Sequence, residues 1–309
     1  MLVVATSSLK GGVGKTTVAL GLAGAAQMHG VRTLVVDLDP QANATVALDA
    51  GPTAASVADV LDEPTRAVLR RAITPSGWGE EIDVLVGAEE TERHNRPDPG
   101  AAQLGRLGRA LGRLADLDDP DDVAEEPDGA ATGSRPATPY RLVIIDCPPS
   151  LGQLTRGALA AADRALLVTD PTMFAVSGVQ RAFDAVQAGV APLALGVLVN
   201  RVRPRNSEHA FRIAELRELF GPLVFSSVLP DRSAVQQAQG ACLPIQRWDT
   251  PGAREVSAVF TTLLGRVLRT GRPRPAVAGR PAGRSADPDP APWTPAAGDG
   301  AALSGATER

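Results

Sequence analysis

Cysteine and aromatic residues are scarce in this 309-residue chain. Its two cysteines, Cys147 and Cys242, exclude a disulfide framework, and they do not stand at the spacing of a metal-ligand pair. Aromatic residues make up 3% of the chain, whereas hydrophobic residues make up 44%. We therefore expect a large aliphatic core in which both thiols are buried.

Long apolar runs and a strong excess of one charge are also missing. No uninterrupted apolar run approaches the ~20 residues of a membrane span, and the first residues have neither the charged segment nor the cleavage site of a signal peptide. We therefore expect a cytoplasmic protein without stable membrane association. A net charge of −4 argues against bulk coating of nucleic acid, so any contact with DNA would need a local basic patch.

A glycine-rich stretch follows the first apolar run of the chain. Residues 10–17 read K-G-G-V-G-K-T-T between apolar runs at 2–5 and 18–23, which predicts a strand, a loop and a helix start. The glycines let successive N–H groups point inward, and the first helical turn adds unpaired donors and a positive dipole end. The predicted nucleotide-binding residues are Gly11, Gly12, Val13, Gly14, Lys15, Thr16 and Thr17. Among them, Lys15 is expected to reach the β- and γ-phosphates, Thr16 to ligate Mg²⁺ and Thr17 to reach the α-phosphate.

Lys10 is a second lysine at this loop, where the ordinary G-x-x-x-x-G-K-[ST] pattern specifies none. Because it cannot easily reach its own phosphates, Lys10 is predicted to neutralise a nucleotide held by a facing subunit, and so to be catalytic together with Lys15. With this lysine, the stretch resembles residue for residue the K-G-G-x-G-K-T-T signature of the deviant Walker A ATPases. That family includes ParA-type DNA partition proteins, MinD-type division-site regulators and nitrogenase iron proteins. The last branch is excluded, because this chain lacks the cysteines of the nitrogenase-type cluster.

Two further apolar runs end in carboxylates. The first precedes Asp37 and Asp39 in a D-x-D-P-Q segment, and the second precedes Asp146 in a D-x-P-P segment. Buried parallel strands end in this way at the ligand crevice of an open α/β sheet, although Asp-Pro is also a common turn opener. By the resemblance, Asp39 is a catalytic residue that positions or activates the attacking water. Asp37 would support the Mg²⁺ shell, and Asp146 would meet Mg²⁺ directly or through water.

Apolar runs alternate with helical patterns along the chain. This alternation predicts one doubly wound α/β domain with a mainly parallel sheet, and the resemblance makes it a P-loop NTPase with a deviant Walker A loop. The domain is expected to span residues 1–270 and to end in a helix at 253–270, and the run at 223–228 looks like the family's final strand. An acidic stretch at 116–139 predicts a disordered insertion, and residues 271–309 predict a disordered tail.

Polar residues beyond these motifs are further candidates. Asn200 ends an apolar run where P-loop relatives use Asn to read the base edge, so it is assigned to adenine; an Asn that merely favours a turn is the alternative. The arginines that follow are candidates either for DNA-phosphate contacts or for a solvated loop. The DNA-binding candidates are Arg201, Arg203, Arg205 and Arg232. In partition proteins an arginine that matches Arg205 contributes to non-specific DNA binding, but Asp231 departs from their pattern and weakens the assignment.

The resemblance implies a Mg²⁺-dependent ATPase that forms a homodimer on ATP and binds non-specific DNA of the nucleoid in that state. A ParB-like centromere-binding protein would reset it. Three alternatives stay open: a MinD-like regulator, which needs a membrane-binding surface; a P-loop synthetase or kinase, which needs a substrate pocket; and an ATPase that positions a non-DNA cargo. The sequence favours the ATPase for chromosome or plasmid partition.

Overall fold

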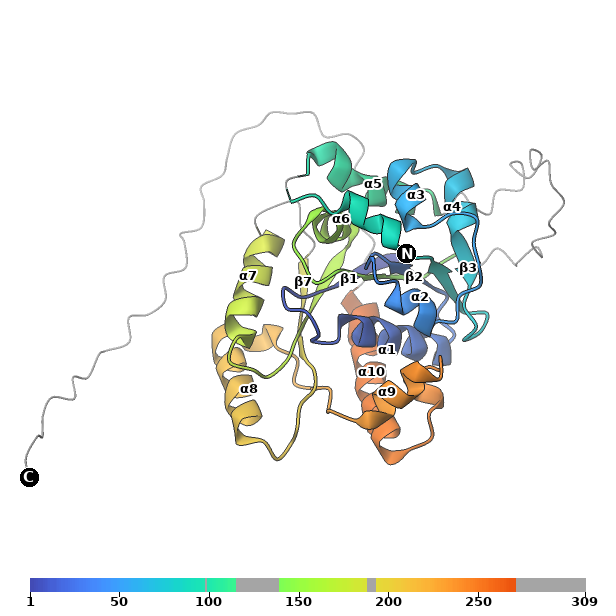
Figure 1. Cartoon of the computed structure of the whole chain (residues 1–309). Coiled ribbons are helices and arrows are strands. Elements are labelled where there is room, and N and C mark those ends of the chain that lie inside the picture. The colour runs from blue at the N-terminus through green and yellow to red at the C-terminus, as the bar shows by residue number, and fades with distance from the viewer. Residues whose placement is uncertain (98, 115–138, 188–192, 271–309) are drawn as a thin grey trace, which may run out of the picture. The chain divides into compact units, whose positions relative to one another are not determined.

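A seven-stranded sheet forms the centre of the computed structural model, which describes residues 1–97, 99–114, 139–187 and 193–270 (Figure 1). The strands are β1 (Leu2–Ser7), β2 (Thr33–Asp37), β3 (Ile73–Pro75), β4 (Ile82–Leu85), β5 (Leu142–Asp146), β6 (Arg164–Thr169) and β7 (Leu193–Val199). Their order is β3-β4-β2-β5-β1-β6-β7, and every pairing except β3 with β4 is parallel. The prediction of a doubly wound, mainly parallel sheet is confirmed.

Helices cover both faces of the sheet (Figure 1). One layer contains α1 (Lys15–Met28), α2 (Asn43–Ala47), α9 (Ser233–Gly240) and α10 (Pro251–Thr270). The other contains α3 (Val57–Asp62), α4 (Arg66–Ala72), α5 (Ala101–Leu111), α6 (Gln153–Ala161), α7 (Ala175–Gln187) and α8 (Ser207–Phe220). Short 3-10 helices, η1 (Glu89–His94), η4 (Gly221–Leu223) and η5 (Ile245–Arg247), lie in the connections. The helix expected at 253–270 is present as α10.

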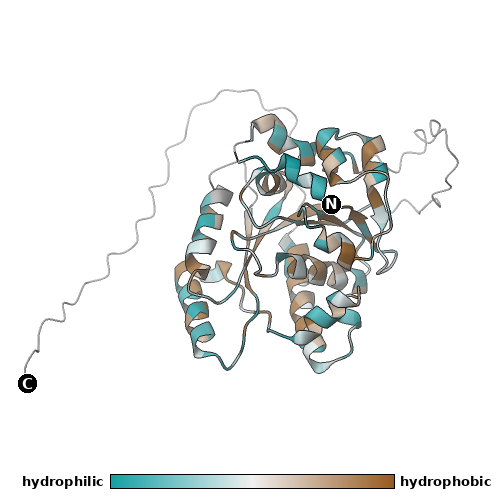
Figure 2. Cartoon of the chain, in the orientation of Figure 1, coloured by the Kyte–Doolittle hydropathy of each residue, from teal (hydrophilic) through white to brown (hydrophobic). Residues whose placement is uncertain are grey.

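The strands divide their side chains between two aliphatic cores. In β1, Val3 and Ala5 belong to the core under α3 to α8, and Leu2 and Val4 belong to the core under α1 and α10. Because successive strand side chains point to opposite faces, a strand covered on both faces needs a nearly continuous apolar run. Figure 2 shows these apolar strands between helices whose apolar sides face them.

The two thiols differ from each other in burial. Cys147 is buried at the end of β5, as expected, whereas Cys242 is only partly buried. Cys242 lies in the loop after α9, where its φ of 52° puts it in the left-handed region. The expectation that both thiols are buried is therefore wrong for Cys242, because a connecting loop at the surface carries it.

The strand expected at residues 223–228 is not formed. The N–H groups of Phe225 and Leu229 donate to the carbonyls of Val197 and Val199, with both N···O distances 2.9 Å. The two acceptors are two residues apart on β7, but the two donors are four residues apart. Extra residues therefore loop out between the two bonds, and a continuous ladder cannot form.

Two predicted boundaries fall outside the part of the chain that the structure describes. Residues 116–138 of the expected insertion and residues 271–309 of the expected tail lie outside the described ranges, so the domain limits stay predictions. Among the described residues, no helix combines the length and the apolar composition that a membrane span requires.

Candidate functional site

The glycine loop connects β1 to α1 at the edge of the sheet where the parallel strands end. Gly12 and Gly14 have φ angles of 76° and 95°, in the left-handed region that favours glycine. A Cβ on Gly14 would lie 2.2 Å from the side-chain nitrogen of Asn200, so the loop also needs glycine for space. Gly14 is the N-cap of α1 and supplies no side chain to the first-turn N–H groups. These donors are therefore suited to an anion such as a phosphate.

The first turn of α1 brings three of the predicted residues to the site. Lys15 is buried, with 6% of its surface exposed, which is unusual for a lysine. Burial raises the pKa of Asp146, whereas the Lys15 charge and the neighbouring Thr16 hydroxyl act to lower it. The Thr17 hydroxyl accepts a hydrogen bond from Nε2 of Gln239 in α9 at 3.3 Å. Lys15 and Thr16 thus lie close to Asp146. Their roles toward phosphate and Mg²⁺ stay predictions.

Asp37 and Asp146 are direct neighbours at the ends of β2 and β5. Both are fully buried. Burial, followed by the charge of Asp37, raises the pKa of Asp146 to about 8. Burial also raises the pKa of Asp37 to about 6, although hydrogen bonds from Thr45 act in the opposite direction. Two adjacent buried carboxylates attract a cation, because each disfavours the charge of the other.

The oxygen atoms of this pair fit Mg²⁺. Oδ1 of Asp146 accepts a 3.4 Å hydrogen bond from the Thr6 hydroxyl, whereas its buried Oδ2 has no hydrogen-bond partner among the described residues. A buried carboxylate oxygen without a donor is a natural ligand for a hard cation. Among the same residues, no three His, Cys, Asp or Glu side chains gather into a metal site of their own.

Asp39 lies two residues beyond the strand end. It is 9% exposed, its N–H donates to Oδ1 of Asp37 at 3.3 Å, and its own Oδ1 accepts the N–H of Gln41 at 3.0 Å. These hydrogen bonds hold Asp39 within the loop that follows β2, next to Asp37. A role in directing water stays a prediction for this residue.

Lys10 lies at the rim of the loop and contacts the next strand end. Its Nζ is 2.8 Å and 3.0 Å from the carboxylate oxygens of Asp170 and 3.1 Å from the hydroxyl of Thr172. The Lys10 side chain is 40% exposed, whereas that of Asp170 is 14% exposed. The two loop lysines therefore differ: Lys15 is enclosed, and Lys10 faces outward beside the end of β6.

Asn200, which follows β7, contacts the backbone of the glycine loop. Its Nδ2 donates to the carbonyl of Val13 at 2.7 Å, and its Oδ1 accepts the N–H of Arg201 at 2.8 Å. Both ends of the amide are therefore engaged with the backbone. Its assignment to adenine stays a prediction, and binding of a base edge there would require one of these bonds to be shared or broken.

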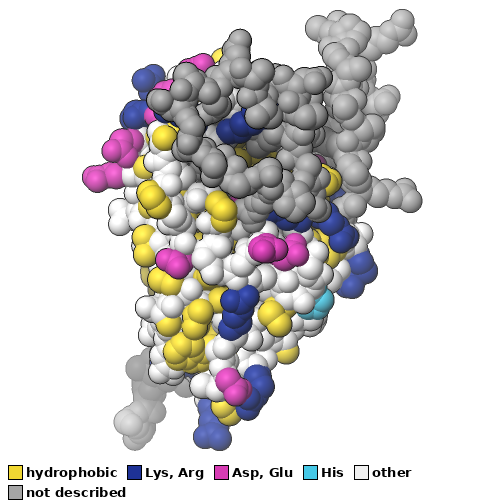
Figure 3. All heavy atoms as spheres, turned by 90° about the vertical axis from the view of Figure 1, so that its right-hand side faces the viewer, with side chains coloured by type: hydrophobic (Ala, Val, Ile, Leu, Met, Phe, Trp, Pro, Cys, Tyr) yellow, Lys and Arg dark blue, Asp and Glu magenta, His cyan; other side chains and the backbone are white. Residues whose placement is uncertain are grey.

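The four candidate DNA-binding arginines fall into two groups. Arg203 pairs with Asp231 at 2.8 Å and Arg232 pairs with Glu255 at 2.7 Å, whereas Arg201 and Arg205 are exposed and form no ion pair with a described residue. Carboxylates therefore neutralise the charge of two of the four arginines. Elsewhere, the face in Figure 3 shows basic, acidic and apolar side chains interspersed where grey atoms leave it visible.

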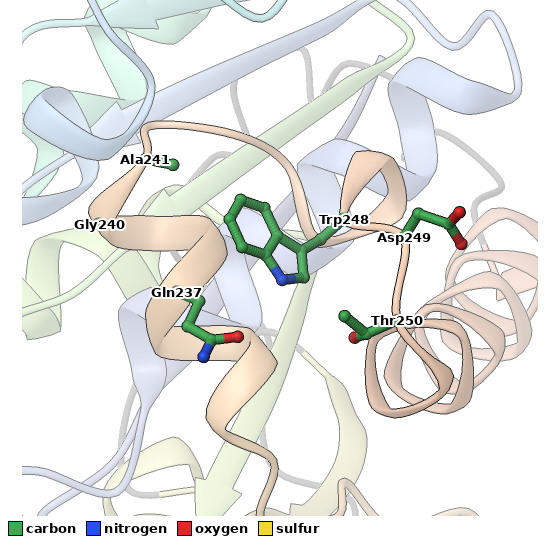
Figure 4. Close-up of a pocket in the computed structure, with 6 residues that line it drawn as sticks. All are labelled: Gln237, Gly240, Ala241, Trp248, Asp249 and Thr250. Atoms are coloured by element: carbon green, nitrogen blue, oxygen red, sulfur yellow. The ribbon is translucent and has the colours of Figure 1, made fainter.

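A groove of about 720 Å³ lies beside α9, outside the predicted site. Figure 4 shows the Trp248 ring in it, between Gln237 of α9 and Thr250, with Asp249 directed away from the ring. None of the predicted site residues lines this groove. Gln239 of the same helix α9 contacts Thr17 at the start of α1.

Three residues at the site were missed by the sequence analysis. Asp170 and Thr172 follow β6, and the end of that apolar run in D-P-T could have singled them out. Thr45 contacts Asp37 from α2, eight residues along the chain. No spacing rule marks such a contact, because it depends on how the loop after β2 turns back.

Comparison with known proteins places this geometry in a family. The model of the CobQ/CobB/MinD/ParA nucleotide binding domain matches residues 4–245. The chain is 30% identical over 285 residues to the "Chromosome partitioning protein ParA" of Caulobacter vibrioides, covering 89% of this chain and 97% of that protein. It is 31% identical over 274 residues to the "Chromosome-partitioning ATPase Soj" of Thermus thermophilus, covering 85% of this chain and 96% of that protein.

A solved structure has the same fold and holds a nucleotide. It is described as cobyrinic acid a,c-diamide synthase from Mycobacterium smegmatis with bound ADP and magnesium. Its TM-score is 0.66 at 25% sequence identity, over 90% of this chain and 100% of that chain.

Proposed function

Because the chain belongs to the CobQ/CobB/MinD/ParA nucleotide-binding family, we propose that it is a Mg²⁺-dependent ATPase that acts in DNA partition. The relatives named for chromosome partition support this class, and the bound ADP and magnesium of the solved relative support the cofactors. The proposal includes an ATP-dependent homodimer, non-specific DNA binding and release by a ParB-like partner.

Each part of the proposed site has a distinct task. The N–H groups of residues 11–17 bind the phosphates, and Lys15 neutralises charge on the β- and γ-phosphates. Thr16 and Asp146 would hold Mg²⁺, with Asp37 beside them. Mg²⁺ held there would supply positive charge to offset that on the phosphate oxygens. Asp39 orients the attacking water.

The position of Lys10 is the observation that carries the dimer. Its ammonium group lies at the rim of the loop against Asp170, while Lys15 occupies the interior. Once it is released from Asp170, the Lys10 ammonium group would be available for the phosphates of a facing subunit.

DNA binding is proposed for the exposed pair Arg201 and Arg205. Both follow Asn200 in the segment after β7. The Arg201 N–H donates to Oδ1 of Asn200, so a nucleotide that binds Asn200 would change the position of this segment. Arg203 and Arg232 would have to leave Asp231 and Glu255 before they contact phosphate. We therefore expect the exposed pair to contribute most of the contact.

Retention of a random-sequence duplex tests this function. We expect binding with ATP, little with ADP and none without nucleotide, and weaker binding at higher salt because phosphate contacts release counterions. Arg205→Ala should lower the logarithmic salt slope by about 1, as for one lost phosphate contact. Arg113→Ala, which removes an exposed charge from the turn after α5, is the matched control. Binding that is equal in all three nucleotide states would contradict the proposal.

A further inference from the structure

The carboxylate of Asp37 is held by a residue outside the predicted site. Oδ2 of Asp37 accepts two hydrogen bonds from Thr45, one from its N–H and one from its hydroxyl, both at 2.8 Å. Oδ1 accepts only the longer 3.3 Å bond from the N–H of Asp39. One oxygen is thus fixed by α2, and the other is left nearly free.

The same hydroxyl is connected to a third segment. Oγ1 of Thr45 accepts the N–H of Gly87, in the loop after β4, at 2.9 Å. Because a backbone N–H can only donate, the Thr45 proton must point to Asp37 and its lone pair to Gly87. The hydroxyl therefore links Asp37 at the end of β2 to Gly87 after β4, as donor to the first and acceptor from the second.

The loop at Gly87 packs directly on this carboxylate. A Cβ at this position would lie 2.8 Å from Cγ of Asp37 and 3.0 Å from its Oδ2. Glycine lets the loop approach closely enough for its N–H to reach Thr45. The three contacts together leave Asp37, which is fully buried, with little freedom to rotate.

We propose that Thr45 is the positioning residue that orients Asp37 toward Mg²⁺. With Oδ2 held by Thr45 and the approach of Gly87 limiting rotation, Oδ1 is the oxygen left for the Mg²⁺ shell. This inference rests on the proposed function, because it assumes that the nucleotide binds together with Mg²⁺. Side chains that orient metal-binding groups typically change metal affinity or activity 10- to 100-fold when they are removed.

A Mg²⁺ titration of nucleotide binding tests the inference without relying on turnover. The probe is a fluorescent ATP analogue, and the measured quantity is the Mg²⁺ concentration that gives half-maximal binding. Thr45→Val removes the hydroxyl and keeps the shape, so this concentration should rise about 10-fold or more. Thr45→Ser keeps the hydroxyl and should stay within about twofold of wild type.

Thr33→Val is the matched control. Thr33 is buried at the opposite end of the same strand, where its hydroxyl donates to the carbonyl of Val31 at 2.7 Å. The control should leave the Mg²⁺ midpoint unchanged, even if it lowers the temperature of unfolding. If Thr45→Val shifts the midpoint no more than Thr33→Val does, or if Thr45→Ser shifts it as far as Thr45→Val, Thr45 does not position Asp37.

The outcomes separate this inference from the proposed function. Mg²⁺-dependent nucleotide binding that Thr45→Val weakens, in a protein that neither dimerises on ATP nor binds DNA, would support the inference and overturn the partition function. Wild-type binding that ignores Mg²⁺ would overturn both.

Discussion

At the scale of single residues, the buried Asp146 opposes folding when no cation is present. Its folded-state pKa of about 8 lies above the ordinary value of 3.8, so the folded protein retains a proton that the unfolded chain releases between these pH values. The stability that the protonated carboxyl provides, relative to the ionised one, is therefore fully present below about pH 4 and is lost as the pH rises through about 8.

Asp146→Asn should stabilise the nucleotide-free protein in alkaline solution. The neutral amide removes a buried charge, so the unfolding temperature at about pH 8 should rise by a few degrees, for a gain of about 1–3 kcal/mol. The gain should shrink at about pH 5, where the carboxyl is already protonated. Thermal unfolding at both pH values measures this, and an equal gain at both would show that burial of the charge is not the cause.

The contact of Lys10 with Asp170 is expected to restrain dimerisation. A partly exposed ion pair contributes roughly 0.2–1 kcal/mol, so its loss should lower the ATP concentration for half-maximal dimerisation by up to about fivefold. Asp170→Asn makes this change with little loss of shape. Light scattering during an ATP titration gives the concentration.

Asp249→Asn is the control for this change. It breaks the exposed pair with Arg254, away from the glycine loop, and should leave the dimer unaffected. A shift as large as that of Asp170→Asn would mean that the loss of net negative charge, rather than the release of Lys10, favours association.

At the scale of the elements, the packing of α1 on α10 supports the nucleotide loop. A Cβ on Gly21 of α1 would lie 2.1 Å from the ring of Phe260 in α10. Gly21→Ala should therefore destabilise the fold by about 1–3 kcal/mol, because the ring cannot move away within a packed core. Chemical denaturation measures the change.

Gly178→Ala in α7 is the opposite case. Outside the adjacent residues and the helix's own backbone, no described atom lies within 4 Å of a Cβ built at this position, so this substitution should be neutral or stabilise by up to about 1 kcal/mol through helix propensity. If Gly21→Ala behaves in the same way as Gly178→Ala, the close approach of α1 to α10 does not limit the stability of the domain.

The parallel strands can be predicted from the sequence because a strand buried on both faces must be apolar throughout. The glycine loop can be predicted because phosphate binding restricts its residues. The prediction of a strand at 223–228 is wrong, because the residues that loop out between its two hydrogen bonds to β7 interrupt the pairing, and the sequence does not show this.

Long-range contacts explain the remaining differences at the site. Asp170 reaches Lys10 across 160 positions, and Gly87 reaches Thr45 across 42. Neither contact leaves a local pattern. The pairing of Arg203 and Arg232 with carboxylates likewise depends on α10 and on the loop before α9, so an arginine-rich stretch overstated the free basic surface.

At the scale of the whole molecule, the proposed active site is composite. We propose that Asp39 and Lys15 of one subunit and Lys10 of the other form each site. Two impaired variants should then complement each other: Lys10→Ala lacks the lysine that is proposed to cross the interface, and Asp39→Ala lacks the group that is proposed to direct water. A mixed dimer contains one site with Lys15 and Asp39 from the first variant and Lys10 from the second.

The ATPase rate of an equimolar mixture of these two variants is the most direct measurement of this claim. Each variant alone should hydrolyse ATP slowly. The mixture should recover up to about a quarter of the wild-type rate, because half of the dimers are mixed and each holds one intact site. A mixture no faster than the mean of its two components would contradict the account, because Lys10 would then act on the nucleotide of its own chain.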